Sequence, residues 1–361
     1  MDYQRIDIHP DIHKAETPPS RFYTDPAVHM RQRELVFARS WQYARADLPK
    51  EGAGVAPFTL LEGSLAEPLV LTRDESGQER ILSNVCTHRG AIVAHKACKA
   101  TSLSCGYHGR RFGLDGTFRS APEFQGAEHF PTHRDDLPAL QLERFGPLRF
   151  TALQQRYSLD EHVGDLGARL SHLPLLDLVH DASRDRSFEF GANWALYCDN
   201  FLEGLHIPFV HPTLNAAVEF EGYRTELLRH SSLQIALAKP GTPAFTPPRS
   251  SPDQGQRIAG YYAWVFPNLM LNFYPWGMSL NLVEPRGVDR TRVRFETWIS
   301  DRAAFESSNA GDLDAIEFED EEVVTDVQRG MRSRLFERGR YAPTREAAVH
   351  HFHRLMMSAL V

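Results

Sequence analysis

The chain has 361 residues, of which 42% are hydrophobic, and it carries a formal net charge of -7. This composition is typical of a globular protein with a sizeable core, and the length allows two domains. The negative charge argues against nucleic acid or an anionic membrane as the main partner, and four cysteines are too few for a disulfide-built fold.

The N-terminus lacks a basic segment followed by an apolar run, so we predict that it is not a signal peptide. No stretch of the sequence approaches the roughly 18 apolar residues of a membrane span. We therefore expect a cytoplasmic protein, in which Cys98 and Cys198 remain free thiols.

In chain order, residues 21–45 are the first predicted element. Pro26 suits a first helical turn and apolar residues follow at helical spacing, so this segment predicts a helix. Residues 55–85 alternate in polarity and contain turn signals, which is typical of short antiparallel strands. Residues 112–116 resemble a hairpin turn, and residues 146–150 predict a closing strand.

The second half of the chain predicts a mixture of strands and helices. Residues 186–201 indicate a strand leading into a helix, and the Pro-, Ser- and Gly-rich residues 239–256 indicate a loop. Residues 257–300 hold alternating aromatic and aliphatic runs that favour strands, and residues 312–335 favour a long helix.

Two short segments carry a metal motif. Cys86 and His88 form C-x-H, and sixteen residues later Cys105 and His108 form C-x-x-H. A Rieske [2Fe–2S] centre takes two thiolates on one iron and two imidazoles on the other, and this motif supplies that set. The alternative is zinc, but finger-type zinc sites usually pair Cys with Cys and His with His. The motif therefore favours a Rieske cluster.

A second metal site is predicted from His206 and His211, which lie five positions apart with Pro208 between them. Two histidines and one carboxylate bind Fe(II) and leave positions open for O2 and substrate. We select Asp320 as the third ligand, on the predicted helix at 312–335. Four other acids in that run compete with it: Glu317, Glu319, Glu321 and Glu322.

With these motifs in this order, the chain resembles the catalytic alpha subunit of Rieske non-heme iron oxygenases over nearly its whole length. The segments 198–204, 327–330 and 349–353 most resemble choline monooxygenase and the related trimethylamine-type (betaine and carnitine) oxygenases. The resemblance implies an α+β fold. An antiparallel Rieske domain at 41–153 would be followed by a catalytic domain at 154–361, a curved antiparallel sheet covered by helices (helix-grip type). Residues 1–40 would belong with the catalytic domain.

The family also implies how the two metal centres work together. A head-to-tail homotrimer places the cluster of one subunit beside the iron of the next, and an acid three residues before the first histidine connects them. In this chain that acid is Glu203. Electrons would come from a separate NAD(P)H-dependent reductase, with or without a ferredoxin, because the chain lacks a G-x-G-x-x-G nucleotide motif.

The resemblance implies hydroxylation of a C–H bond, and the subgroup favours an alkyl carbon of a quaternary or tertiary amine such as choline or a betaine. A quaternary ammonium would favour an aromatic box. The candidates are Phe209, Trp264, Phe273, Tyr274 and Trp276. The alternative is an oxygenase of an aromatic or aromatic-acid substrate, whose relatives often carry a small second subunit. A Rieske electron carrier without catalysis is disfavoured, because single Rieske domains are far shorter.

The sequence departs from the family inside the second cluster loop. Family members usually have Pro before the Tyr-His pair and Trp after the following Gly, where this chain has Gly106 and Arg110. We expect Arg110 to add a charge near the cluster surface and to alter docking of the reductase or the neighbouring subunit. Respiratory Rieske proteins brace the two loops with a disulfide, which Gly106 and Tyr107 exclude here.

Overall fold

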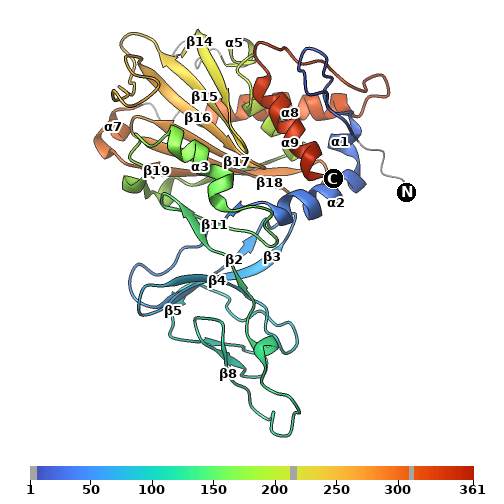
Figure 1. Ribbon diagram of the computed structural model, residues 1–361, viewed down its shortest axis with the longest axis vertical. Helices are drawn as coiled ribbons and strands as arrows, with labels where there is room; N and C mark the ends of the chain where they lie inside the picture. Colours follow the sequence, from blue (N-terminus) through green and yellow to red (C-terminus); the bar gives the residue numbers. More distant parts are fainter. Residues whose placement is uncertain (1–5, 212–217, 309–312) are drawn as a thin grey trace. The chain divides into compact units, whose positions relative to one another are not determined.

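The computed structural model describes residues 6–211, 218–308 and 313–361. The first five residues, on which the signal-peptide prediction rests, lie outside these ranges. The chain forms two units, Trp41–Gln155 and the combination of Met1–Ser40 with Arg156–Val361 (Figure 1). Each unit has its own antiparallel sheet, which confirms the α+β class. Within the described ranges, no helix is long and apolar enough to cross a membrane.

The unit Trp41–Gln155 is built from three small antiparallel sheets. The central sheet has the strand order β5-β2-β3-β4-β9, and the other two have the orders β1-β11-β10 and β6-β7-β8. The strands are β1 (Gln42–Tyr43), β2 (Gly54–Leu60), β3 (Glu67–Arg73), β4 (Glu79–Ser83), β5 (Cys98–Lys99), β6 (Leu103–Ser104), β7 (Arg111–Phe112), β8 (Phe118–Ser120), β9 (Ala139–Leu140), β10 (Glu143–Phe145) and β11 (Leu148–Thr151). The predicted hairpin at 112–116 and the closing strand at 146–150 are confirmed as the β7–β8 turn and β11.

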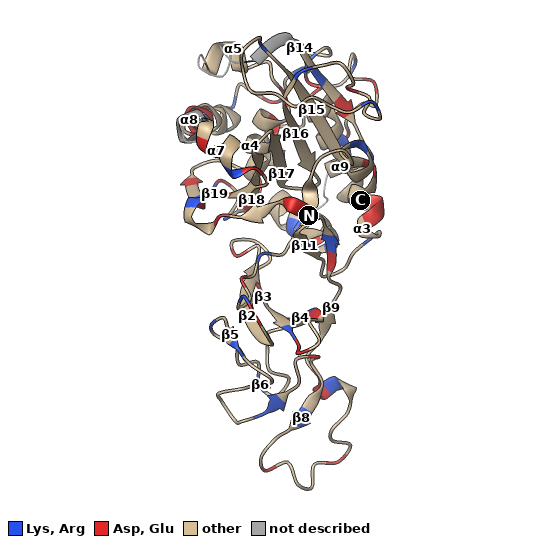
Figure 2. Cartoon of the chain, turned by 90° about the vertical axis from the view of Figure 1, so that its left-hand side faces the viewer, with Lys and Arg blue, Asp and Glu red and all other residues tan. Residues whose placement is uncertain are grey.

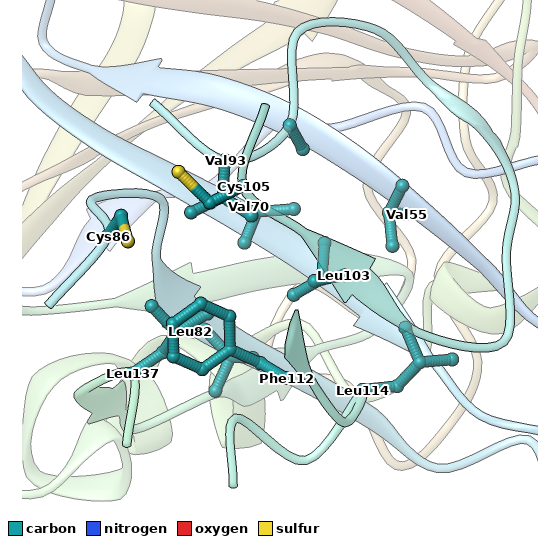
Figure 3. Packing of buried hydrophobic residues seen from close by; sticks show 11 residues of the cluster. Val55, Val70, Leu82, Cys86, Val93, Leu103, Cys105, Phe112, Leu114 and Leu137 are labelled. Atoms are coloured by element: carbon teal, nitrogen blue, oxygen red, sulfur yellow. The ribbon is translucent and has the colours of Figure 1, made fainter. Parts of the chain in front are cut away.

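A compact apolar core packs side chains of β6 and β7 against side chains of β2, β3 and β4 (Figure 3). It packs Phe112, Leu82 and Val70 against the two cluster cysteines, Cys86 and Cys105, both of which are buried. In Figure 3 the two sulfurs lie toward the same end of this core. The core therefore fixes the backbone at both predicted thiolate ligands.

The other unit contains an eight-stranded antiparallel sheet with the order β12-β19-β18-β17-β16-β15-β14, in which β13 also pairs with β19. The strands are β12 (Val179–His180), β13 (Arg186–Phe190), β14 (Val218–Leu227), β15 (Ser231–Ala238), β16 (Ile258–Val265), β17 (Leu269–Tyr274), β18 (Gly277–Pro285) and β19 (Thr291–Ile299). The predicted loop at 239–256 separates β15 from β16. Blue and red residues are interspersed along both units, so the net charge of -7 is not confined to one element (Figure 2).

The same unit contains helices, several of which contact this sheet (Figure 1). They are α1 (Arg21–Thr24), α2 (Pro26–Arg31), α3 (Leu159–Arg169), α4 (Trp194–Phe201), α5 (Ile207–Val210), α7 (Arg302–Ser307), α8 (Leu313–Met331) and α9 (Ala347–Ala359). Trp194 of α4 and Trp264 of β16 both pack edge-on against Phe352 of α9, at 5.8 and 5.2 Å between ring centroids. Helix α4 also packs against α8 and β18. These contacts hold α4 and α8 next to the sheet.

The first predicted helix is divided in the structure. Helix α1 ends at Thr24, and α2 begins at Pro26, where the side chain of Asp25 accepts a hydrogen bond from the backbone N–H of Ala27 at 2.8 Å. The cause is chemical, because Pro has no N–H to continue the α1 hydrogen-bond pattern and Asp is a good N-cap. A π-helix over Gln32–Val36 and a 3-10 helix over Phe37–Arg39 follow.

Candidate metal centres

His206 and His211 flank the four-residue helix α5, and Asp320 lies on the long helix α8. His206 immediately precedes α5, Pro208 lies in its first turn, and His211 follows its last residue. The non-helical backbone of His211 (φ -117°, ψ 77°) ends the short helix and lets both imidazoles reach Asp320, although residues five apart in a continuous helix would not share a face. Their Nε2 atoms lie 3.6 Å (His206) and 2.9 Å (His211) from Oδ1 of Asp320.

The donor chemistry of this group fits a metal site. One ligand atom from each of the three residues lies within 4.8 Å of the others. Two neutral nitrogens and one carboxylate oxygen are the donor set of non-heme Fe(II) oxygenases. Among the described residues it is the one His/Cys/Asp/Glu group found with such spacing.

A carboxylate also lies within hydrogen-bond distance of the other ring nitrogen, Nδ1, of each histidine. Nδ1 of His206 lies 2.6 Å from Oε1 of Glu203, and Nδ1 of His211 lies 2.7 Å from Oε2 of Glu319. Such partners fix the tautomer that leaves Nε2 free for a metal. Burial by itself lowers the pKa of His211, but the hydrogen bonds to Asp320 and Glu319 outweigh it and raise that pKa. From the sequence, Glu319 is predicted only as a competitor of Asp320, and this supporting role is not predicted.

The remaining competing acids of α8 have other partners or surroundings. Glu317 is buried and accepts a hydrogen bond from the hydroxyl of Tyr197 at 2.7 Å. Burial raises the pKa of Glu321, and Glu322 is exposed. Asp320 is therefore the acid of this run that faces both histidines through Nε2.

A cavity of about 250 Å³ opens next to this group and lies entirely within the sheet-and-helix unit. One wall is a row of residues that are directly opposite one another across five strands of the sheet. The row consists of Gln234, Tyr262, Asn272, Ser279 and Thr297. Side chains of a strand alternate between faces, so this register places the whole row on the side of α4 and α8.

The cavity combines aromatic and charged side chains. Its aromatic residues include Tyr223, Tyr262 and Tyr274, and the rings of the last two meet edge-on at 5.9 Å between centroids. Burial raises the pKa of Tyr262 to about 12, so this phenol is neutral at physiological pH. Two arginines, Arg184 and Arg186, also line the cavity, and the guanidinium of Arg184 lies 4.5 Å from the centroid of the Phe305 ring.

Of the five aromatic residues predicted for the substrate box, the structure places only Tyr274 on the wall of this cavity. Phe273 is the preceding residue on β17 and therefore faces the opposite side of the sheet. Trp264 shares the face of Tyr262 but lies further along β16, against Phe352. Phe209 is 82% exposed, and Trp276 packs against Phe305 behind Tyr274. These four predicted positions therefore do not line this cavity, because sequence spacing does not tell which strand face, or which part of it, borders a cavity.

The two cluster loops are closed by the same backbone pattern. In the first loop the N–H of Gly90 donates to the carbonyl of Cys86 at 3.0 Å, and in the second the N–H of Gly109 donates to the carbonyl of Cys105 at 3.1 Å. Both glycines have φ near +70°, a conformation that other residues rarely adopt. The C-x-H-x-G and C-x-x-H-G spacings are thus two versions of one tight turn, which brings each Cys and His to one edge.

The four ligand side chains fit a Rieske cluster. Cys86 and Cys105 are buried and their thiols interact, while the rings of His88 and His108 are more exposed and lie 4.7 Å apart. Buried thiolates beneath two outer imidazoles are the arrangement that a [2Fe–2S] cluster held by two cysteines and two histidines requires. Cys98 and Cys198 are free, as the sequence predicted.

Arg110 does not lie at the surface, and the expectation that its charge faces docking partners is corrected. Its side chain is only 3% exposed. The guanidinium lies over the rings of Phe118, Phe124 and Phe130, and it pairs with Asp135 at 3.3 Å. Residues 118–135 fold over the position, which the sequence motif alone does not indicate.

Comparisons with known proteins show the family to which the chain belongs. A family model described as the ring hydroxylating alpha subunit (catalytic domain) matches residues 176–360, and a Rieske [2Fe-2S] domain model matches residues 45–131. The chain is 31% identical to the chloroplastic choline monooxygenase of Arabidopsis thaliana, over 96% of this chain and 83% of that protein. It is 28% identical to the carnitine monooxygenase oxygenase subunit of Escherichia coli K12, over 95% and 93%. A solved structure of the quaternary ammonium Rieske monooxygenase CntA superposes with a TM-score of 0.82 at 22% identity, covering 99% of this chain and 100% of that one.

Proposed function

Because the chain belongs to the ring-hydroxylating alpha-subunit family of Rieske oxygenases, we propose that it hydroxylates an alkyl carbon beside the nitrogen of a quaternary or tertiary amine. Members of this family hold a Rieske [2Fe–2S] cluster and a mononuclear iron, which when bound supply electron transfer and O2 activation. We assign the cluster to Cys86, His88, Cys105 and His108, and the iron to His206, His211 and Asp320.

The observation that supports an amine is the tyrosine-rich wall beside the His-His-Asp group. Neutral phenol rings present π-electron faces that attract a trimethylammonium group, as in other sites for quaternary ammonium ligands. Tyr262 stays protonated because burial raises its pKa to about 12. The carboxylates of Glu203, Glu317 and Asp320 also line the cavity and favour a cation there. The substrates named for the similar choline and carnitine oxygenases are of this class.

A second candidate substrate class is a carboxylated one, and Arg184 and Arg186 support it. Both arginines line the cavity near Phe305 and Phe295, and Arg186 is directly opposite Phe295 in the sheet. A betaine would satisfy the tyrosines with its ammonium and an arginine with its carboxylate. An aromatic acid would use the arginines alone.

In the proposed reaction, O2, two protons and two electrons from a separate NAD(P)H-dependent reductase convert C–H to C–OH and release one water. When the carbon lies beside nitrogen, the C–N bond of the product breaks, and an amine and an aldehyde are formed. The residues of this chain bind the amine, exclude bulk water and keep Nε2 of both histidines available for iron.

We propose that Glu203 connects neighbouring subunits of a homotrimer. Its two oxygens accept hydrogen bonds from Nδ1 of His206 and from the backbone N–H groups of Leu205 and His206. A carboxylate accepts about four hydrogen bonds, so capacity remains for a histidine N–H from a second subunit. Light scattering of the purified protein tests the trimer, and fractionation tests the cytoplasmic location that the sequence predicts.

The test of function is a single turnover, which avoids the unidentified reductase. The cluster of anaerobically purified protein is reduced chemically, and O2 is added with choline, glycine betaine, L-carnitine or an aromatic acid. We expect an aldehyde and cluster oxidation with one of the ammonium compounds. A phenol or diol from the aromatic acid, with no aldehyde from any amine, would establish the alternative.

A further inference from the structure

One buried cation lies between the two cluster loops. Nη1 of Arg110 donates to the hydroxyl of Thr87 at 2.9 Å, and Thr87 lies between the ligands Cys86 and His88. Arg110 itself follows the second loop, and its carbonyl accepts a hydrogen bond from the N–H of Cys105 at 2.8 Å. A single side chain therefore joins the base of the second loop to the middle of the first.

Three phenylalanine rings enclose the guanidinium. Its central carbon lies 5.3 Å from the centroid of Phe118, 5.0 Å from that of Phe124 and 5.3 Å from that of Phe130. The ring of Phe124 also lies 5.2 Å from that of His88. Arginine stays protonated in proteins, so its charge is permanent. The rings keep water away, and the charge is therefore weakly screened.

The counter-charge is more accessible to water than the cation. Oδ1 of Asp135 lies 3.3 Å from Nη1 of Arg110, and the Asp135 side chain is 17% exposed against 3% for Arg110. Asp135 also takes part in the connection through its backbone carbonyl, which accepts from the Thr87 hydroxyl at 2.8 Å. The carboxylate is therefore screened more strongly than the guanidinium, whose Nη1 contacts Thr87.

We propose that Arg110 holds the two cluster loops together and raises the reduction potential of the Rieske cluster. Reduction adds one electron to the cluster, and a nearby weakly screened cation stabilises the added negative charge. The hydrogen bonds through Thr87 connect the two loops, where Gly106 and Tyr107 leave no cysteine for a disulfide.

This inference rests on the presence of the cluster but not on the substrate, so it fails independently of the proposed reaction. The measurement is the midpoint potential of the cluster in the full-length protein, by a redox titration followed by circular dichroism or EPR. The variants are Arg110→Gln, Arg110→Lys and Asp135→Asn. Arg111→Gln is the matched control, because Arg111 is adjacent in sequence but exposed.

Opposite charge changes must shift the potential in opposite directions. We expect Arg110→Gln to lower the equilibrium constant for one-electron reduction about tenfold, or about 59 mV. We expect Asp135→Asn to raise the midpoint potential. The potential of Arg110→Lys should stay close to that of the parent protein, and Arg111→Gln should change the potential least. A merely structural role would shift Arg110→Gln and Asp135→Asn in the same direction. That result, or no shift beyond the Arg111→Gln control, overturns the proposal.

The bracing role has its own measurement. Loss of visible absorbance in the presence of a chelator reports the release of iron from the cluster. We expect Arg110→Gln and Thr87→Val to lose the cluster several-fold faster than Arg110→Lys. If Arg110→Gln does not assemble a cluster, the midpoint potentials of Asp135→Asn and Arg110→Lys test the electrostatic role of Arg110. A potential that does not rise in Asp135→Asn contradicts this role.

Discussion

Oδ1 of Asp320 lies 2.9 Å from Nε2 of His211 and 3.6 Å from Nε2 of His206, the other histidine of the proposed iron site. The carboxylate of the preceding residue, Glu319, reaches the opposite nitrogen of the same ring at 2.7 Å. Successive residues of a helix point in different directions, so one turn of α8 holds both ends of a single imidazole. Only one of the two carboxylates is placed to bind a metal.

This arrangement predicts unequal effects of the two acids on iron content. Asp320→Ala removes one of three metal donors, so iron falls from about three to about two per chain while sulfide stays near two. Glu319→Gln still accepts a hydrogen bond from His211, and its iron affinity falls roughly 10-fold, the lower end for residues that orient a ligand. Iron and acid-labile sulfide are measured on anaerobically purified protein.

Glu322→Gln is the control for this comparison, because Glu322 is an exposed acid on the same helix. It should keep the parent iron content. Loss of iron in Glu319→Gln with retention in Asp320→Ala would exchange the roles that we assign. His206→Ala should behave like Asp320→Ala.

The contact between Glu203 and His206 predicts a defect in electron transfer rather than in iron binding. Glu203→Gln keeps an oxygen that accepts from Nδ1 of His206 but loses its negative charge. We expect nearly full iron content and a roughly 10- to 100-fold slower oxidation of the reduced cluster when O2 and substrate are added. Stopped-flow absorbance of the cluster measures this rate. An unchanged rate would limit Glu203 to orienting His206.

The proposed ligand residues can be selected from the sequence because their chemistry is tied to short spacings. C-x-H and C-x-x-H each fit one tight turn, and the two histidines flank the short helix α5 that contains Pro208. Asp320 lies more than a hundred residues away from both, and only the amphipathic helix pattern and the family resemblance pointed to it. Local geometry is readable from local sequence, whereas the choice among four neighbouring glutamates depended on how α8 is rotated.

The substrate wall and Arg110 show where sequence reasoning stops. Tyr262 and Asn272 could have been found from alternation, since Asn272 shares a strand face with Tyr274. Which part of that face borders a cavity depends on the register of five strands. The surroundings of Arg110 depend on a loop that returns more than twenty residues later to Asp135. Neither relationship has a local signal.

The tyrosine wall predicts a charge-dependent loss of binding. Tyr262→Leu removes a cation–π partner worth about 0.5–2 kcal/mol, which corresponds to roughly a 2- to 30-fold higher Kd. The best ammonium substrate is compared with its neutral isostere, in which carbon replaces the charged nitrogen. The Kd of the isostere should change much less. Phe209→Leu is the control, because that ring is 82% exposed. If Tyr262→Leu raises the Kd of both ligands equally, Tyr262 contributes to binding only by its shape.

A buried histidine away from the metal site predicts how stability depends on pH. His162 of α3 is fully buried, its ring stacks on Tyr157 at 5.4 Å, and burial lowers its pKa to about 3. His230, 5.8 Å away, adds to this effect. The folded protein therefore keeps His162 neutral under conditions in which the unfolded chain, with a pKa near 6.5, takes up a proton.

The sign of the pH effect follows from that difference. Between about pH 6.5 and 3 the unfolded state binds more protons at this position, so the contribution of His162 to stability is complete above pH 6.5 and declines as the pH falls. At pH 5.5 the loss is about 1.4 kcal/mol, which lowers the Tm of a unit of this size by roughly 3 °C. His162→Phe cannot titrate. We expect the Tm difference between the parent protein and His162→Phe, measured first at pH 8, to shift against the parent protein by that amount at pH 5.5. A difference that stays constant with pH would show that His162 takes up its proton in the folded state.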